Sequence, residues 1–162
     1  MLSWKDFAQL SPEFAAEGEK RLDGPGVVLV GTVRRDGAAR ISPVEPMFLG
    51  GRLYLGMMWQ SKKALDLVRD PRVLVHSVIS RREGDEGEFK LRGRALDVSD
   101  PDERERYAQA VFEKIAWRPG EPYHLFAVDI EAATLIWYGN ERKNITHWTL
   151  ASGETRRWDE AG

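Results

Sequence analysis

Alternating apolar and polar residues dominate the chain and predict short β-strands joined by tight turns. Asp36-Gly37 separates two such runs and is a strong hairpin signal. Gly50-Gly51 predicts the next turn. The expected strands cover residues 27–35, 39–49, 52–58, 72–80 and 89–98, followed by YHLFAVDI, ATLIWYG, NITHWTL and a last arm in GETRRW.

Three segments have helical spacing instead. The apolar residues between positions 3 and 22 recur near helical period, and Asp23-Gly24-Pro25-Gly26 ends that helix. A short helix follows Ser61 and ends before Asp70-Pro71, and a third begins at Asp100-Pro101 and runs to about Ala116. The pattern predicts one domain over residues 1–162, mainly β (α+β), built as an antiparallel barrel with helices around it.

Proline residues interrupt the predicted strand over residues 39–49. Pro43 and Pro46 cannot donate ladder hydrogen bonds, so this strand is expected to be broken or to lie at an edge. Neighbouring backbone groups would then be free to meet a ligand, and a flat heterocycle with polar edges would suit them. The alternative is that the prolines only protect a sheet edge.

Composition excludes several classes of function. The 24 basic and 26 acidic residues give a net charge of -2, so no basic footprint for nucleic acid or an anionic membrane exists. The chain has no cysteine, and its three histidines are scattered, so no metal site is expected. The longest apolar run is VVLV, and the first ten residues, MLSWKDFAQL, are too polar for a signal peptide. These features favour a cytoplasmic protein.

Catalytic motifs are missing from the sequence. It contains no GxGxxG fingerprint, no Walker loop and no GxSxG elbow. The segment RREGDEGE at residues 81–88 is expected to be a solvated loop. No nucleophile–base set stands out, so the catalytic residues remain unknown, and a bound cofactor is expected to carry any chemistry.

The segment WQSKKALDLVRDPR, residues 59–72, holds the clearest binding signal. Ser61 can cap the helix, and Lys62 and Lys63 would be its first two helical residues. Two cations are unfavourable beside the positive end of a helix dipole unless an anion joins them, and free N–H groups there bind phosphate. The alternative is that both lysines extend into water. In a meander, Arg40 would lie on a neighbouring strand and approach the same anion.

The order of these segments resembles the pyridoxamine 5'-phosphate oxidase-like family of flavin-binding split β-barrels. The resemblance runs from about Trp4 to Trp148. It rests on VVLVGTVRRDGAARISPVEP, GGRLYLGMM, SKKALDLVRDPRVLVHS and GEFKLRGRA in that order. The C-terminal residues that grip pyridoxal phosphate in the true oxidase are not found, so the chain is closer to the uncharacterised bacterial branch.

The resemblance implies a set of cofactor contacts. Lys62 and Lys63 match the basic pair that holds the cofactor phosphate, although the family more often has Arg-Lys. Glu45 stands where a lysine often follows, and Gly56 stands where the oxidase has a tyrosine. Met57, Met58 and Trp59 would form an apolar wall near the ring, or equally part of the core or of a dimer contact. The implied cofactor-binding residues are Arg40, Ile41, Ser42, Pro43, Val44, Met57, Met58, Ser61, Lys62, Lys63 and Glu88.

The resemblance also implies a function. The chain is expected to be an FMN-binding oxidoreductase that passes hydride to an unknown small-molecule substrate, as a homodimer with the cofactor at the interface. One alternative is an F420-dependent reductase on the same fold. Another is a flavin- or haem-related binding protein without turnover.

Overall fold

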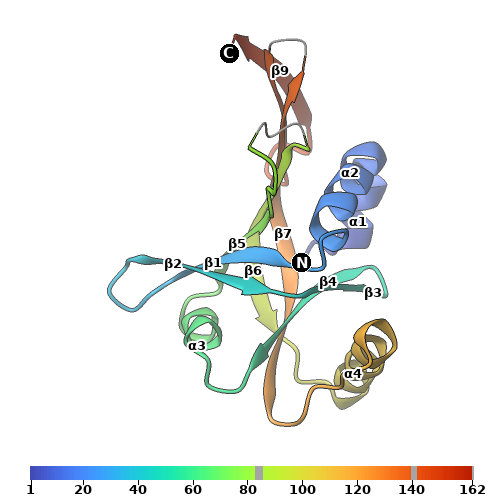
Figure 1. Cartoon of the computed structure of the whole chain (residues 1–162), viewed down its shortest axis with the longest axis vertical. Helices are drawn as coiled ribbons and strands as arrows, with labels where there is room; N and C mark the ends of the chain where they lie inside the picture. The colour runs from blue at the N-terminus through green and yellow to red at the C-terminus, as the bar shows by residue number, and fades with distance from the viewer. Residues whose placement is uncertain (83–85, 140–141, 162) are drawn as a thin grey trace.

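Nine antiparallel strands of the described residues form the framework of the protein. The computed structural model describes residues 1–82, 86–139 and 142–161. Seven strands follow the order β2-β1-β5-β6-β7-β4-β3, and β8 and β9 extend the sheet from β7 (Figure 1). The strands are β1 Val28–Val33, β2 Ala39–Val44, β3 Pro46–Leu49, β4 Arg52–Met58, β5 Arg72–Ser77, β6 Glu88–Asp97, β7 Tyr123–Gly139, β8 Arg142–Thr149 and β9 Thr155–Ala161.

The sheet curls into a split barrel, and the two strands at the ends of the strand order are consecutive in the chain. β2 and β3 stand at opposite ends of the strand order, yet only Glu45 separates them in the chain. No ladder joins these two strands within the described residues. The predicted interruption at the prolines is therefore confirmed, and the antiparallel split-barrel fold with it.

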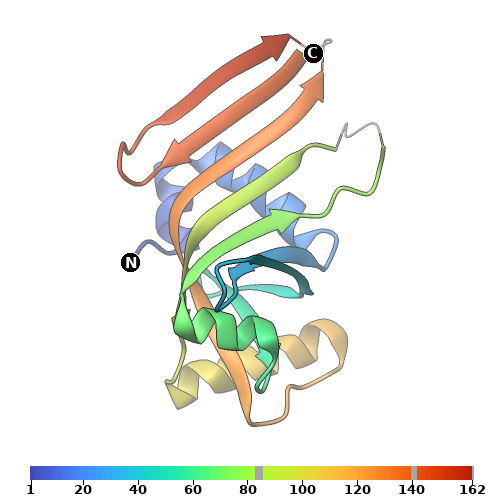
Figure 2. The ribbon, with the colours of Figure 1, turned by 90° about the vertical axis from the view of Figure 1, so that its left-hand side faces the viewer.

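In the part of the chain that the structure describes, four helices cover the barrel. α1 Trp4–Leu10 and α2 Pro12–Asp23 lie on one side, and α3 Lys62–Arg69 and α4 Pro101–Ile115 lie toward the other end (Figures 1 and 2). The prediction of one helix over residues 3–22 is wrong, because the chain breaks at Ser11. Pro12 takes the first position of α2, where its missing N–H costs nothing. Among the described residues, none of the helices is long and apolar enough to cross a membrane.

β7 corrects a second prediction. YHLFAVDI and ATLIWYG are one 17-residue strand rather than two, and its halves pair with different neighbours. The register against β6 shifts between Arg92 and Gly93, which leaves Glu131 as an extra residue in β7. This bulge bends the strand, so one half closes the barrel beside β4 and the other half carries β8 and β9 outward (Figure 2).

The predicted polar loop at residues 81–88 lies partly outside the described residues, since 83–85 are not described.

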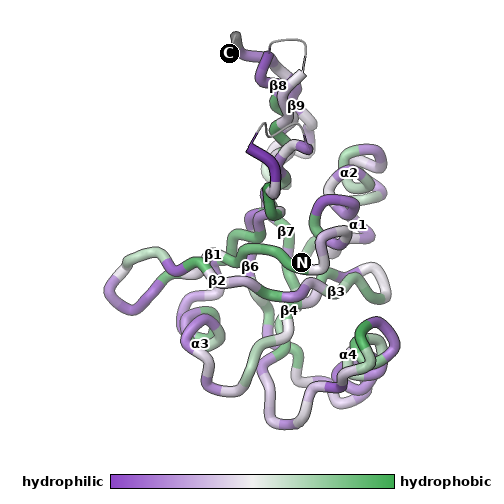
Figure 3. The backbone as a smooth tube through the Cα atoms, in the orientation of Figure 1, coloured by the Kyte–Doolittle hydropathy of each residue, from purple (hydrophilic) through white to green (hydrophobic). Residues whose placement is uncertain are grey.

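The buried side chains form two clusters. The larger fills the barrel and includes the aromatic chain Trp4, Phe7, Phe89 and Trp148. The smaller lies under α4 and consists of Met47, Tyr54, Val98, Tyr107, Val111, Tyr123, Leu125 and Ala127. Apolar residues follow the barrel strands, whereas polar residues concentrate in the turns and in the β8–β9 arm (Figure 3). The smaller cluster matters for function because it forms the floor of a cavity.

Candidate functional site

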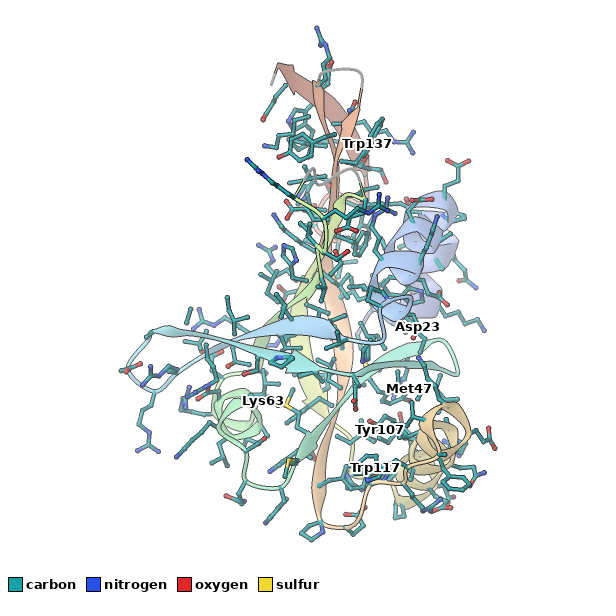
Figure 4. The ribbon with its side chains drawn as sticks, in the orientation of Figure 1. Asp23, Met47, Lys63, Tyr107, Trp117 and Trp137 are labelled. Carbon is teal, nitrogen blue, oxygen red and sulfur yellow. The ribbon has the colours of Figure 1, made fainter. Side chains whose placement is uncertain are left out.

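A cavity of about 610 Å³ opens between the start of α3 and the helix α4. This volume lies within the usual range for small-molecule and cofactor sites, about 300–1,000 Å³. Its walls come from the β2–β3 junction, the end of β4, α4 and the loop after α4. In Figure 4, Met47, Tyr107 and Trp117 lie on the α4 side, and Lys63 lies across from them on α3.

The N-terminus of α3 meets this cavity at Lys63. The Lys63 Nζ donates a hydrogen bond to the Pro43 carbonyl oxygen at 2.9 Å, which joins α3 to β2. Lys62 is exposed, and no acidic residue lies in the first turn of α3. As predicted from the sequence, Lys62 and Lys63 are the first two helical residues.

Ser61 differs from its expected role. It occupies the position before the helix, but its side chain makes no capping hydrogen bond. Its Oγ is buried and has no partner among the described residues. A buried hydroxyl without a partner costs free energy, so this atom is suited to accept or donate a hydrogen bond when a ligand is present.

Arg40 is held beside α3 by Asp66. Its Nε donates to the Asp66 Oδ2 at 2.7 Å, and the Thr32 hydroxyl donates to the same oxygen at 3.0 Å. The terminal nitrogens of Arg40, Nη1 and Nη2, have no hydrogen-bond partner among the described residues and remain free to bind a ligand. Arg40 is thus placed beside α3 by Asp66, whereas the expected pairing of its strand with the strand before the lysines is not found among the described residues, since β2 pairs with β1 and β4 pairs with β3 and β7.

The buried Asp66 carboxylate is the counter-charge of this cluster. Burial opposes its ionisation, but hydrogen bonds from Arg40 and Thr32, with a smaller one from Arg69, hold its pKa below the usual 3.8. Arg40 and Arg69 pair with this one carboxylate, while Lys62 and Lys63 at the start of the same helix have no carboxylate partner among the described residues. The cluster therefore keeps an excess of positive charge and can bind an anion such as a phosphate.

Only some of the predicted cofactor-binding residues line the cavity. Five of them line the cavity: Pro43, Val44, Met57, Met58 and Lys63. Arg40, Ser61 and Lys62 are next to its α3 side. Ile41 and Ser42 lie on β2 without lining the cavity, and Ile41 is 70% exposed.

Glu88 lies apart from the cavity. Its carboxylate lies 3.1 Å from the His76 Nε2 and 2.8 Å from the Lys90 Nζ. The ladder registers place it on the same face of the sheet as Pro43, with β1 and β5 between them. Any contact with a ligand in the cavity would therefore need that ligand to reach across this face.

Several cavity residues could not be assigned from the sequence. Tyr107 of α4 places its hydroxyl against Gly56, where an added Cβ atom would come within 2.1 Å of it. Burial, with the nearby Tyr123 and the Glu45 carboxylate, raises the pKa of Tyr107 to about 12. The phenol is therefore protonated at neutral pH. The one sequence signal for Tyr107 was its place on the apolar face of the predicted helix.

Trp59 forms the wall nearest α3. Its ring stacks on His124 with 4.5 Å between centroids and an interplanar angle of 13°, and His124 in turn stacks on Phe126. The His124 Nε2 is buried and has no partner among the described residues. The stack fixes the indole of Trp59, which remains 52% exposed and lines the cavity.

The arrangement can bind a molecule that has both an anionic and a flat part. The basic cluster at α3 suits a phosphate, and the proline-interrupted strand with its apolar walls suits a ring. Among the described residues, no group of His, Asp or Glu side chains has the arrangement of a metal site.

Comparison with known proteins supports the resemblance seen in the sequence. The family model described as pyridoxamine 5'-phosphate oxidase matches residues 14–137. No curated protein sequence gives a significant match.

Solved structures share the fold at low sequence identity. PhzG from Burkholderia lata 383, solved with tetrahydrophenazine-1-carboxylic acid, matches with a TM-score of 0.68 at 9% identity, covering 98% of this chain and 93% of that one. A Clostridium acetobutylicum protein related to general stress protein 26, of the pyridoxinephosphate oxidase family, has a TM-score of 0.63 at 14% identity, covering 88% and 98%.

A haem-binding protein from Mycobacterium smegmatis also shares the fold. It has a TM-score of 0.62 at 20% identity over 83% of this chain, which spans only 57% of that protein. At these identities the likenesses establish the fold alone.

Proposed function

The chain belongs to the pyridoxamine 5'-phosphate oxidase family, and we propose that it is an FMN-binding oxidoreductase acting on a small molecule. One observation carries the proposal. Lys63 at the start of α3 lines a cavity of cofactor size, the neighbouring Ser61 hydroxyl has no partner among the described residues, and Asp66 holds Arg40 beside the same helix with its terminal nitrogens free.

The residues present fit the cofactor in charge and shape. Lys62, Lys63 and Arg40 would hold its phosphate, and the Ser61 Oγ would gain the partner that it lacks. Pro43 and Val44 at the end of β2 would line the ring, and Met57 and Met58 would shield it from water. When bound, a flavin supplies a ring that accepts and passes hydride. The protein contributes anchoring, orientation and exclusion of water.

We propose further that the protein is a homodimer with the cofactor at its interface. Ile41 and Leu74 both lie opposite Gly31, on its two sides, and are 70% and 40% exposed. This row forms an apolar stripe on the outward face of the barrel, next to Pro43. A second copy covering the stripe would bury it, and would also enclose the face that carries Glu88.

Absorption of the purified protein is the first test. A bound flavin gives a yellow protein, whereas F420 absorbs at shorter wavelength and fluoresces blue-green. The same basic cluster would suit the long anionic tail of F420, so the spectrum decides between them. A protein that takes up neither FMN nor F420 in titrations would contradict the proposed function.

A non-catalytic role is the second candidate, and it is motivated by the haem-binding protein of M. smegmatis that shares the fold. Stopped-flow measurement of flavin reduction distinguishes this binding role from the proposed oxidoreductase. An oxidoreductase of the flavin type should lose its flavin absorbance on mixing with NADH or NADPH, whereas a storage or binding protein should keep it. Binding of haem in place of flavin would give an intense Soret band.

A further inference from the structure

The α4 side of the cavity has chemistry of its own. Among the residues that the structure describes, Lys63 is the one basic residue that lines the cavity, and it lies on the α3 side, where its Nζ donates to the Pro43 carbonyl oxygen (Figure 4). Glu45 is the one acidic residue in this described lining. The remaining surface on the α4 side is apolar or aromatic and includes Tyr107, Trp117 and Tyr123.

The Glu45 carboxylate has no protein partner to neutralise it. It is exposed at the junction between β2 and β3, and it makes no hydrogen bond or ion pair with any residue that the structure describes. Its charge reaches Tyr107, whose hydroxyl also lacks a hydrogen bond among the described residues. An unpaired carboxylate at the edge of an apolar cavity favours a ligand that brings a positive charge or several N–H donors.

The aromatic walls favour a flat ligand. Trp59 and Trp117 are 52% and 56% exposed, although both line the cavity. Tyr107 and Tyr123 lie 6.1 Å apart between ring centroids and add two more aromatic surfaces. Such rings attract both planar molecules and cations, because their faces carry negative potential.

The surroundings disfavour an anion at this position. Arg104 in α4 and Arg118 in the loop after α4 are already paired. Arg104 donates to the Glu121 carboxylate and to the Tyr123 carbonyl oxygen, and Arg118 pairs with Glu105. Neither lines the cavity. A phosphate or carboxylate here would face Glu45 without a compensating cation.

We propose that the α4 side of the cavity is a substrate site for a flat aromatic molecule with a protonated amine, and that Glu45 receives the ammonium group. The inference rests on the proposed function, in which the α3 side holds the cofactor. The substrate would then lie between the cofactor and the Trp117 wall, with its charge directed away from the phosphate anchor. It would not be a phosphate ester.

A matched set of probes tests the charge preference. Tryptamine, 3-methylindole and indole-3-acetate share an indole ring and carry a positive, neutral and negative group. Each probe is titrated by isothermal calorimetry into the protein loaded with the cofactor that copurifies. Tryptamine should bind with the highest affinity and indole-3-acetate with the lowest. Glu45→Gln should weaken tryptamine about tenfold or more, as expected for the loss of a charge-assisted hydrogen bond. Glu154→Gln, an exposed change in the β8–β9 turn, is the control and should leave all three titrations unchanged.

Reversal of the charge at residue 45 is a more stringent test of the same charge preference. In Glu45→Lys the order should invert, with indole-3-acetate binding more tightly than tryptamine. The inference is overturned if Glu45→Gln leaves the tryptamine affinity unchanged, if the wild type does not discriminate among the probes, or if no probe binds.

A separate FMN titration keeps this inference distinct from the proposed function. FMN binding without any preference for tryptamine overturns the substrate site alone. A tryptamine preference that depends on Glu45, in a protein that binds no flavin, overturns the cofactor assignment alone.

Discussion

The Nε of Arg40 lies 2.7 Å from the Oδ2 of Asp66, so a strand residue and a helix residue 26 positions apart form one buried anchor. Asp66 is only 5% exposed, and Thr32 donates to the same oxygen. Because the Nε makes this bond, the guanidinium is oriented while its terminal nitrogens stay available. Asp66 therefore positions Arg40 for an anion, and it also stabilises the contact between β2 and α3.

Asp66→Asn should lower stability in a pH-dependent way. The pKa of Asp66 is lower in the folded protein than the value near 3.8 that it has in the unfolded chain. Its carboxylate therefore contributes fully to the free energy of unfolding above the unfolded pKa, and this contribution is lost as pH falls through the folded pKa. At pH 7 the variant should be less stable by about 1–3 kcal/mol. Urea unfolding at pH 7 and near pH 3 should show that the difference in unfolding free energy between wild type and variant becomes smaller at the lower pH.

Asp97→Asn is the matched control for this series, because Asp97 is exposed and makes no hydrogen bond or ion pair with the described residues. It should change little at either pH. A gap for Asp66→Asn that stays constant with pH would contradict the role given to the carboxylate.

Lys63→Ala should weaken FMN binding more than Lys62→Ala. Lys63 lines the cavity, whereas Lys62 is exposed beside it. Loss of one charge-assisted hydrogen bond costs roughly 1.5–3 kcal/mol, or about 10- to 150-fold in Kd. Fluorescence titration with FMN measures this, with Lys20→Ala on α2 as a control. Equal FMN affinity in wild type and Lys63→Ala would remove the phosphate site from the start of α3.

Gly56→Ala should force Tyr107 out of place. The added Cβ would lie 2.1 Å from the Tyr107 hydroxyl and 3.0 Å from its Cζ, which is too close for either atom. We expect a loss of about 1–3 kcal/mol in unfolding free energy. Tyr107→Phe removes the hydroxyl, so the same glycine change should cost less in that background.

A double-mutant cycle in urea measures this coupling between Gly56 and Tyr107. Additive effects would mean that the two residues do not compete for the same space.

Ile41→Lys should disrupt the proposed dimer. Ile41 is 70% exposed on the apolar stripe beside Gly31, so a charge there would oppose burial by a second copy. Light scattering after size exclusion should show a shift toward monomer. Leu10→Lys, at a 58% exposed position at the end of α1, should leave the mass unchanged. A wild-type protein that is monomeric at all concentrations would exclude the dimer.

Local signals in the sequence were enough to predict several elements to the residue. β4 runs from Arg52 to Met58 as expected, because Gly50 and Gly51 take positive φ angles of 58° and 79° that a side chain would disfavour. α3 begins at Lys62 and ends before Asp70-Pro71 for an equally local reason, since the residue before a proline avoids helical geometry.

The two failures have different causes: the helix break at Ser11 is local to Pro12, whereas the continuity of β7 depends on its pairing with β6. The apolar spacing over residues 3–22 continues through Ser11, so the pattern hid the break before Pro12. The predicted strands YHLFAVDI and ATLIWYG left a gap at residues 131–132. Pairing with β6 keeps the strand continuous and accommodates Glu131 in a bulge.

The sequence alone determined the strand order of the hairpins, the interruption at Pro43 and Pro46, and the basic start of α3, because each depends on residues close together in the chain. Tertiary structure decided that Asp66 would hold Arg40, that Tyr107 would fill the space over Gly56, and that Glu45 and Trp117 would line one cavity. Those contacts join distant segments, and their energies depend on burial, which no single segment contains.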